Sequence, residues 1–448
     1  MQTSDWTQYP LLSALRERRS RRFGLGMKIP AGPLAYASRH RPVPLTEAEE
    51  AALVFAAGGI TGHALADLAY APGEGGNIMA GLVARTIASG DGLQTVGLAV
   101  VNDQATYLIR KPRELPASEI PALIELGRRG EFTELYRRTR VKLRDGRVAP
   151  PKEPLFNINA NRWSVHAPGT SYFLPINDLT FMYVNGLLEI LNETTGVFLL
   201  DERNHFRPAG LGRFARSRGG HLEDDPRQGR VATVRQIEQF VTEFVTVEQG
   251  MMLQNLGLAA QALGLGGFPN FANHEFGWFQ ALGFRMEKIP LNRYVGASPL
   301  VSLALKLLNR NPEIPCPIGL EHDGEILLKP FCPPYYPSMA DAVRAVVDLK
   351  FGANGIFRRS GGGPWPDHGK IARDVPPISD AAIAATTAYC EYLWERYGRF
   401  PVYLPPYRTV LGFQAGHLDA EFYDRFYRPE ALGETQRKDF EEISRRPR

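Results

Sequence analysis

The sequence has little cysteine and no long apolar run, and both absences restrict the class of protein. The three cysteines, Cys316, Cys332 and Cys390, form no CxxC pair, and an odd number does not suit a framework of disulfides. We therefore expect free, buried thiols in a cytoplasmic protein. No window reaches the roughly 18 uncharged apolar residues of a transmembrane helix, and the N-terminal region lacks the apolar core of a signal peptide.

Several catalytic and binding patterns are also missing. The nine histidines show no HExxH or comparable metal-ligand spacing, and no GxSxG occurs. Basic and acidic side chains nearly balance, 52 against 48, and no dense basic stripe is interleaved with aromatic residues, so we expect no nucleic-acid partner. His417 and Asp419, with Gln414 and Glu421 in FQAGHLDAEF, form a polar group. A structural histidine explains it more simply than a metal, so no metal site is predicted.

The length of 448 residues predicts more than one structural unit, and the composition changes near residues 333–337. We place a domain at residues 1–335, with an insertion around 110–235, and a helical, aromatic-rich C-terminal extension at 336–448. The many aromatic residues of that extension form either its own core or the roof of a substrate pocket.

Apolar spacing and capping signals predict the main helices and strands. Helices are expected at 46–57, 117–129, 131–140, 176–192, 245–263, 339–350 and 380–397. Hairpins are expected at 95–109 and 318–328, a loop at 71–77, and a mobile loop or lid at 206–228. The helix at 245–263 is apolar nearly all round and is expected to be buried, with a tight loop after Gly264.

A run of arginines follows a short apolar segment in LLSALRERRSRRF, from Leu11 to Phe23. Such a run is usually a solvated face. However, guanidinium groups match the geometry of a phosphate, and Ser20 lies between the arginines with a further hydroxyl donor. The run is therefore either a charged surface or an anchor for a phosphate.

Four motifs in order resemble the FMN-dependent nitroreductase-like flavoproteins. They are RRSRRF at 18–23, the helix start PLTEAE at 44–49, ASGDGLQTVGLAVVND at 88–103, and VEQGMMLQNLGLAAQALGLGG at 247–267. The segment GGITG at 58–62, followed by Arg85-Thr86, further resembles the azoline-dehydrogenase branch, whose members oxidise peptide thiazolines and oxazolines. The Lys-Tyr pair typical of that branch has no convincing match.

The resemblance implies which residues bind the cofactor FMN. By position they are Arg18, Arg19, Ser20 and Arg22 for the phosphate, Ser89 and Gln94 for the isoalloxazine or ribityl chain, and Gly266 and Gly267 for flavin N5. Three alternatives remain at these positions. The extra Arg21 leaves open which guanidinium groups point inward, residues 88–94 also suit a plain loop, and the glycines also suit a helix C-cap. Asn77 is a candidate for the asparagine contact that Asp91-Gly92 replaces.

The resemblance also implies the fold and the reaction. The expected fold is α+β: a small, mostly antiparallel sheet wrapped by helices, in a homodimer with FMN at the interface and the extension over the partner or the flavin. Hydride would pass through flavin N5 between NAD(P)H and a small organic acceptor, and no catalytic side chain is predicted because the flavin does the chemistry. The alternatives are a dehydrogenase of a peptide or natural-product intermediate, and a non-catalytic flavin-binding or partner-binding scaffold.

Overall fold

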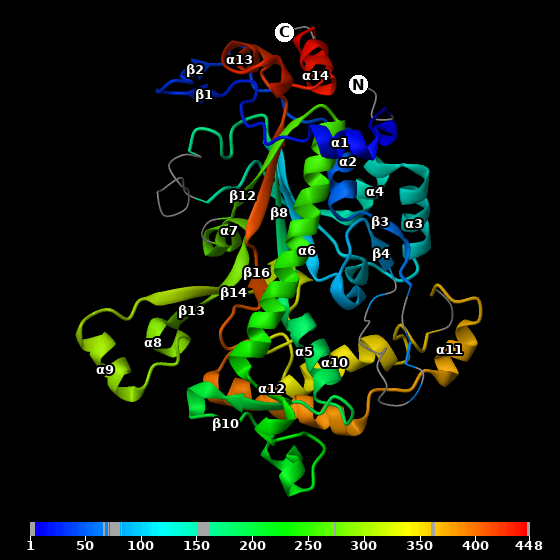
Figure 1. Ribbon diagram of the computed structural model, residues 1–448, viewed down its shortest axis with the longest axis vertical. Coiled ribbons are helices and arrows are strands. Elements are labelled where there is room, and N and C mark those ends of the chain that lie inside the picture. The colour runs from blue at the N-terminus through cyan, green and yellow to red at the C-terminus, as the bar shows by residue number, and fades with distance from the viewer. Residues whose placement is uncertain are drawn as a thin grey trace.

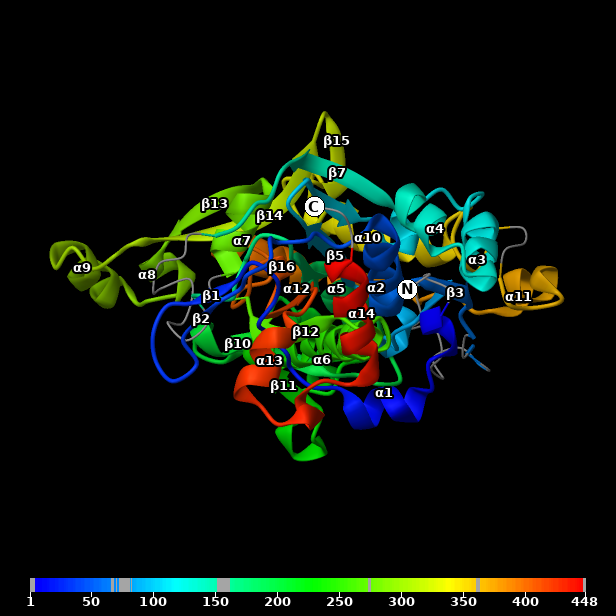
Figure 2. The same ribbon diagram turned by 90° about the horizontal axis from the view of Figure 1, so that it is seen from above.

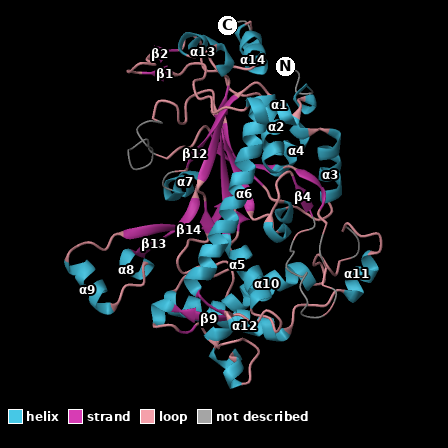
Figure 3. Ribbon diagram, in the orientation of Figure 1, coloured by secondary structure: helices cyan, strands magenta, loops and turns pink. Residues whose placement is uncertain are grey.

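The computed structural model describes residues 5–65, 68–69, 71, 81, 83–150, 162–272, 275–359 and 363–445. A seven-stranded sheet lies at its centre, in the order β12–β17–β8–β5–β6–β7, with β16 also paired to β8 (Figure 3). Every pairing in this sheet is antiparallel. Its strands are β5 (Val96–Val101), β6 (Ala105–Ile109), β7 (Arg140–Asp145), β8 (Ser171–Asp178), β12 (Gly266–Phe271), β16 (Tyr407–Arg408) and β17 (Leu411–Gly416).

Four smaller sheets surround it. They comprise β1 (Lys28–Ile29) with β2 (Tyr36–Ala37); β3 (Ile60–His63) with β4 (Val83–Arg85); β9 (Phe198–Asp201) with β10 (Arg207–Pro208) and β11 (Val231–Thr233); and β13 (Phe284–Pro290) with β14 (Glu313–His322) and β15 (Glu325–Leu328). The only parallel pairing among the described strands joins β11 to β9. The expected mixed architecture with small antiparallel sheets is therefore confirmed.

Helices cover the central sheet and extend beyond it (Figure 1). They are α1 (Leu11–Glu17), α2 (Glu47–Gly58), α3 (Ile120–Arg129), α4 (Phe132–Thr139), α5 (Leu179–Ile190), α6 (Val234–Ala262), α7 (Glu275–Leu282), α8 (Leu291–Tyr294), α9 (Pro299–Leu307), α10 (Met339–Phe351), α11 (His368–Asp374), α12 (Asp380–Tyr397), α13 (Ala420–Phe426) and α14 (Glu434–Ser444). Among the described residues, no helix has the length and apolarity needed to cross a bilayer.

Strands β5 and β8 are buried along their whole length because both faces of the sheet are covered. Side chains alternate between the two faces of a strand. In β5, Leu98 and Val100 therefore pack in the core beneath α2 and α6, whereas Ala99 and Val101 pack in the core that contains Trp278 of α7. A third core joins α5, α6, α10 and α12 beyond the end of the sheet.

Helix α6 is the longest element, with 29 residues, and it crosses one face of the sheet (Figure 1). A capping box begins it, in which Thr233 and Gln236 each satisfy a main-chain N–H of the other. Gly264 ends it at a φ of 80°, the left-handed conformation that glycine adopts most easily. Seen from above, α1, α13 and α14 gather near one end of α6 (Figure 2).

Most of the predicted elements are confirmed. The Thr46–Glu49 capping box begins α2, and α12 has the predicted bounds. The predicted hairpin at 318–328 is present as β14 and β15, and Asp323 and Gly324 both adopt positive φ, 49° and 79°, in its turn. The three cysteines are free and buried.

Some boundaries were wrong. The predicted helix at 176–192 begins only at Leu179, where Asp178 caps it by accepting the N–H groups of Thr180 and Phe181, and the residues before it form β8. The expected tight loop after Gly264 contains strand β12, and α6 begins well before residue 245.

The two predicted loops have different outcomes. The segment 206–228 contains β10 and short 3₁₀ turns, and its leucines Leu211 and Leu222 are fully buried, so the hydrophobic core anchors it. Nearly all of the predicted loop at 71–77, including Asn77, lies outside the described residues.

Residues on both sides of the predicted boundary at 335/336 share the central sheet. Strand β17 lies between β12 and β8, and β16 also pairs with β8. Phe413 of β17 is opposite Phe173 of β8 and is 1% exposed in the core beneath α6. The C-terminal part of the chain therefore supplies an internal strand of the sheet.

Replacing Phe413 with alanine should lower the free energy of unfolding by about 3–5 kcal/mol, because a buried phenylalanine is removed and a cavity is left. Urea unfolding followed by circular dichroism measures this loss. Leu307→Ala is the control: Leu307 is 77% exposed, so the change should stay within about 0.5 kcal/mol. An equally small effect of Phe413→Ala would contradict the internal position of β17.

Candidate functional site

The arginine run lies where the start of the chain meets the end of α6 and the C-terminal helices. Arg21 is its buried member, at 5% exposure. Its Nη1 donates to Gln261 Oε1 of α6 at 2.8 Å, its Nε to the carbonyl of Ala431 at 2.6 Å, and its Nη2 to the carbonyl of Glu17 at 3.3 Å. Burial lowers the pKa of Arg21. These contacts answer part of the question that the sequence left open, because the extra arginine points inward and joins parts of the fold.

A cavity of about 390 Å³ opens beside Arg21. Arg19, Ser20 and Arg22 line one side of it, so three of the four residues predicted for a phosphate are brought together there. Aromatic side chains form much of the remaining wall: Phe23, Trp163, Phe422, Tyr423 and Tyr427. The volume lies within the range of cofactor sites, about 300–1,000 Å³.

The individual side chains of the run have different surroundings. The guanidinium of Arg22 lies over the ring of Phe268 in β12, 4.7 Å from its centroid. Arg19 is exposed, and its Nη1 donates to the carbonyls of Arg16 and Arg18 at 2.9 and 3.0 Å. The stem of Arg18 packs against α6 at Gly257, where a Cβ in place of the glycine hydrogen would lie 3.3 Å from Arg18 Cδ.

The predicted glycine pair lies at the start of β12, next to the arginine run. Gly266 and Gly267 pair with Gly416 and Ala415 of β17, and Arg21 forms a main-chain bridge with Gly267. A Cβ at Gly266 would clash with the side chain of Leu418, and one at Gly267 would clash with the ring of Phe413. Close packing against β17 and the residues after it therefore accounts for glycine at both positions.

The predicted loop that contains Ser89 and Gln94 contacts α6 at a different position, at Glu248. The hydroxyl of Ser89 donates to Glu248 and accepts the main-chain N–H of Gln94 at 2.8 Å. Glu248 also accepts hydrogen bonds from Thr95 Oγ1 at 2.5 Å and Asn177 Nδ2 at 2.9 Å. This buried carboxylate fixes the loop to α6.

Gln94 is held in an unusual conformation beside a second cavity. Its φ is 53°, a backbone conformation that residues other than glycine rarely adopt. Its side-chain Oε1 is buried and accepts no hydrogen bond from the described residues. The cavity measures about 160 Å³ and is also lined by Lys111 and Arg113. Each of these cations has an acidic partner: Lys111 pairs with Glu114 at 2.9 Å and Arg113 with Asp178 at 2.7 Å.

The two groups of predicted residues are separated within one chain. The loop is fixed to α6 at Glu248 and the arginine run at Gln261, thirteen residues further along. At 1.5 Å per residue this corresponds to about 20 Å along the helix axis. The structure thus gathers the arginine run and the glycine pair, and it places the Ser89–Gln94 loop elsewhere.

The GGITG and Arg85-Thr86 segments contact each other at the end of α2. Arg85 Nε donates to the carbonyl of Gly58 at 2.6 Å, and Thr86 Oγ1 donates to the carbonyl of Ala56 at 2.9 Å. The last carbonyls of a helix have no partner within it, so these contacts satisfy them. Burial lowers the pKa of Arg85 to about 10. The need to satisfy the last carbonyls of α2 thus explains why the GGITG segment and Arg85-Thr86 lie together.

The sequence analysis did not identify Glu248 or Trp163. It did give the aromatic residues of the C-terminal extension as either a core or the roof of a pocket, and Phe422, Tyr423 and Tyr427 line the cavity. Glu248 is the single charged residue of the predicted helix at 245–263, and this was the available signal. No local signal indicated that Phe422 and Tyr423 face the arginine run, because the two segments are about 400 residues apart in the chain.

Comparisons with known proteins add little. No protein-family model matches the chain, and no curated protein sequence matches it. One solved structure, described as "a putative nitroreductase" from Ralstonia eutropha JMP134, is similar with a TM-score of 0.29 and 13% identity, over 61% of this chain and 75% of that chain. Similarity of this degree does not place the chain in a family.

Replacing Arg21 with glutamine should lower the free energy of unfolding by about 1.5–3 kcal/mol or more, because hydrogen bonds from a charged donor are lost and buried acceptors lose their partner. Arg19→Gln is the matched control: its side chain is exposed, so the change should stay within about 0.5 kcal/mol. Chemical denaturation of both variants measures the difference. Equal stabilities would mean that Arg21 does not join these parts of the fold.

Proposed function

We propose that the chain is an FMN-dependent oxidoreductase of the nitroreductase-like type, in which residues 19–22 hold the cofactor phosphate. The observation that carries this proposal is the cavity beside Arg21. Arginine and serine donors line one side of it, and aromatic rings form much of the rest. No acidic side chain is among its described lining residues, so the site suits a doubly charged anion.

The residues present fit FMN in three respects. Arg19, Ser20 and Arg22 offer charge-assisted and hydroxyl donors for the phosphate. Aromatic walls suit a flat ring system, and the volume is sufficient. When bound, FMN supplies hydride chemistry at its ring, for which we propose a nicotinamide donor and a small organic acceptor. The protein residues bind and orient the cofactor and exclude water.

A homodimer would complete the site. Helix α6 is buried on one face only, and its other face exposes Phe240 (58%), Val247 (55%) and Met251 (38%) at helical spacing. Gly250 lies in the same stripe, and nothing is within 4 Å of where its Cβ would be. A glycine inside a helix costs about 1 kcal/mol relative to alanine. Close approach of a second α6 would offset that cost.

Such a dimer would also bring the two separated groups together. Gln254, exposed on the same face, lies midway between Glu248 and Gln261 along α6. If two α6 helices cross in antiparallel fashion near Gln254, the Ser89–Gln94 loop of one chain faces the arginine run of the other. In this arrangement FMN lies between the two chains.

The proposal is tested first on the purified full-length protein. A yellow protein with flavin absorption that NADH or NADPH bleaches supports an oxidoreductase. A flavin that binds but resists both nicotinamides, and is reduced only by an organic substrate, indicates a dehydrogenase of that substrate. A colourless protein that does not take up added FMN would overturn the proposal and favour a partner-binding scaffold.

Replacing Arg22 with alanine should weaken FMN binding by about 1.5–3 kcal/mol, roughly 10- to 150-fold in Kd, because a charged phosphate donor is lost. Quenching of flavin fluorescence on titration measures Kd. Arg16→Ala is the control from the same segment, since its side chain is 77% exposed and lies near Glu17. Equal Kd values for the two variants would show that the phosphate is held elsewhere.

Replacing Val247 with glutamate should dissociate the dimer, because it places a charge in the centre of the apolar stripe. Light scattering after gel filtration measures the mass, and circular dichroism confirms that the exposed position tolerates the change. Leu300→Glu is the control, an 80% exposed leucine on α9. If the α9 variant dissociates and the α6 variant does not, the interface is misassigned.

A further inference from the structure

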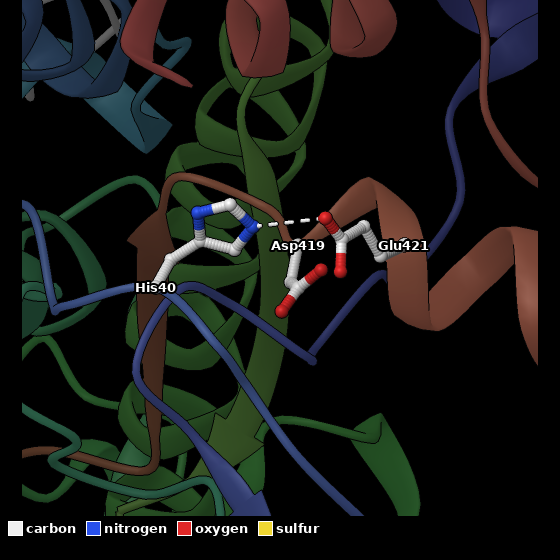
Figure 4. Close-up of side chains that lie close together, drawn as sticks. All are labelled: His40, Asp419 and Glu421. Carbon is white, nitrogen blue, oxygen red and sulfur yellow. Dashed lines mark ion pairs between the residues drawn. The ribbon is translucent and has the colours of Figure 1, made fainter.

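His40, Asp419 and Glu421 lie together beside the N-terminus of α13 (Figure 4). His40 comes from the segment after β2, Asp419 is the residue before α13, and Glu421 lies in its first turn. His40 Nε2 is 3.4 Å from Glu421 Oε1, and one ligand atom from each residue lies within 4.8 Å of the other two. Segments almost 380 residues apart thus supply one nitrogen and two carboxylate ligands.

The Asp419 carboxylate is the feature that points to a ligand. The residue is fully buried, and its Oδ1 accepts the N–H of Phe422 at 3.3 Å. Its Oδ2 is also buried and accepts no hydrogen bond from the described residues. A buried carboxylate is costly unless it is paired or coordinates a metal. The Asp419 side chain lies between those of His40 and Glu421 in Figure 4.

We infer that His40, Asp419 and Glu421 bind a divalent transition-metal ion of the zinc type. Imidazole nitrogen and carboxylate oxygen both bind Zn²⁺ at about 2.0–2.2 Å, and three protein ligands leave a fourth position for water. Ligand atoms at the corners of such a tetrahedron are about 3.4 Å apart, which is the His40–Glu421 separation. The Asp419 carboxylate has to move closer to complete the site.

Neighbouring groups hold two of the ligands in place. The ring of His40 packs edge-on against Phe440, with centroids 5.2 Å apart. The hydroxyl of Tyr36 donates to the other oxygen of Glu421, Oε2, at 3.4 Å. Contacts of this kind orient metal ligands and strengthen their binding.

A second cluster nearby serves as a contrast. Glu49, His417 and Asp439 also lie within metal-ligand distance of one another. However, Glu49 Oε2 already accepts from the N–H and hydroxyl of Thr46 at 2.7 Å each, and His417 Nδ1 contacts Asp439 Oδ2 at 2.9 Å. These partners explain the second cluster as hydrogen-bonded structure, as the sequence predicted for His417.

The proposed ion would fix α13 to the segment after β2. Helix α13 supplies Phe422 and Tyr423 to the wall of the arginine cavity, so the ion would hold that wall in place. The site itself does not depend on whether the cavity binds FMN.

The test is a titration of the chelator-treated, full-length protein with Zn²⁺, followed by calorimetry and by metal analysis after gel filtration. We expect saturable uptake of about one ion per chain, a rise in the midpoint of thermal unfolding, and no comparable effect of Mg²⁺. Co²⁺ in the same site should show the visible absorption of a four-coordinate ion.

Two variants and a control locate the site. Asp419→Asn retains an oxygen to cap α13, and His40→Ala changes a residue that is partly exposed, so both should fold. Each should weaken Zn²⁺ binding by at least about 100-fold. Loss of a group that only hydrogen-bonds to a metal ligand costs up to about 100-fold, and loss of a ligand itself should cost at least as much. Glu49→Gln is the control, because glutamine preserves the capping box of α2 and removes a carboxylate only from the second cluster.

Three results would overturn the inference. Uptake that persists in both variants would show adventitious binding elsewhere on the surface. Loss of uptake in Glu49→Gln alone would assign the ion to the second cluster. Absence of saturable uptake by the unmodified protein would mean that the contact between His40 and Glu421 exists without a metal.

Discussion

The buried guanidinium of Arg21 joins parts of the chain that are far apart in sequence. It connects the residues after α1 with α6 through Gln261 and with the segment before α14 through Ala431. The main-chain bridge between Arg21 and Gly267 adds β12 to the same junction. A guanidinium removed from water is stable only if its donors are satisfied. All of these elements must therefore be in place together, and the position of the neighbouring cavity residues follows from that requirement.

The insertion of β17 imposes a second constraint. Strand β17 lies between β12 and β8, so it cannot form all of its hydrogen bonds until both neighbours are present. Its residues, Leu411–Gly416, belong to the C-terminal part of the chain. The same strand leads into Asp419 and α13, which supply Phe422 and Tyr423 to the wall of the cavity and Asp419 and Glu421 to the cluster with His40. The central sheet thus fixes the distance between the arginine run and the aromatic residues that face it.

Local signals in the sequence predicted local structure well. The Thr46–Glu49 capping box, the turn at Asp323-Gly324 and the helix at 380–397 each depend on contacts within a few residues. The last three residues of β8, at 176–178, were assigned to the following helix because burial continues from the strand into α5, and periodicity cannot separate a doubly covered strand from a buried helix. The inward position of Arg21 and the aromatic wall depend on contacts across some 400 residues, and no single segment encodes them.

Helix α6 connects the two candidate regions and carries the exposed face of the proposed dimer. One of its faces is buried against the sheet and carries Glu248 and Gln261, which fix the loop and the arginine run. The opposite face carries exposed apolar residues and Gly250, a residue that weakens an isolated helix. Within a single chain this face stays exposed, and the arginine run lies about 20 Å from the Ser89–Gln94 loop along the helix axis. Both features are explained at once if two chains pack along α6, so in the proposed enzyme the assembly of the dimer and the assembly of the flavin site are the same event.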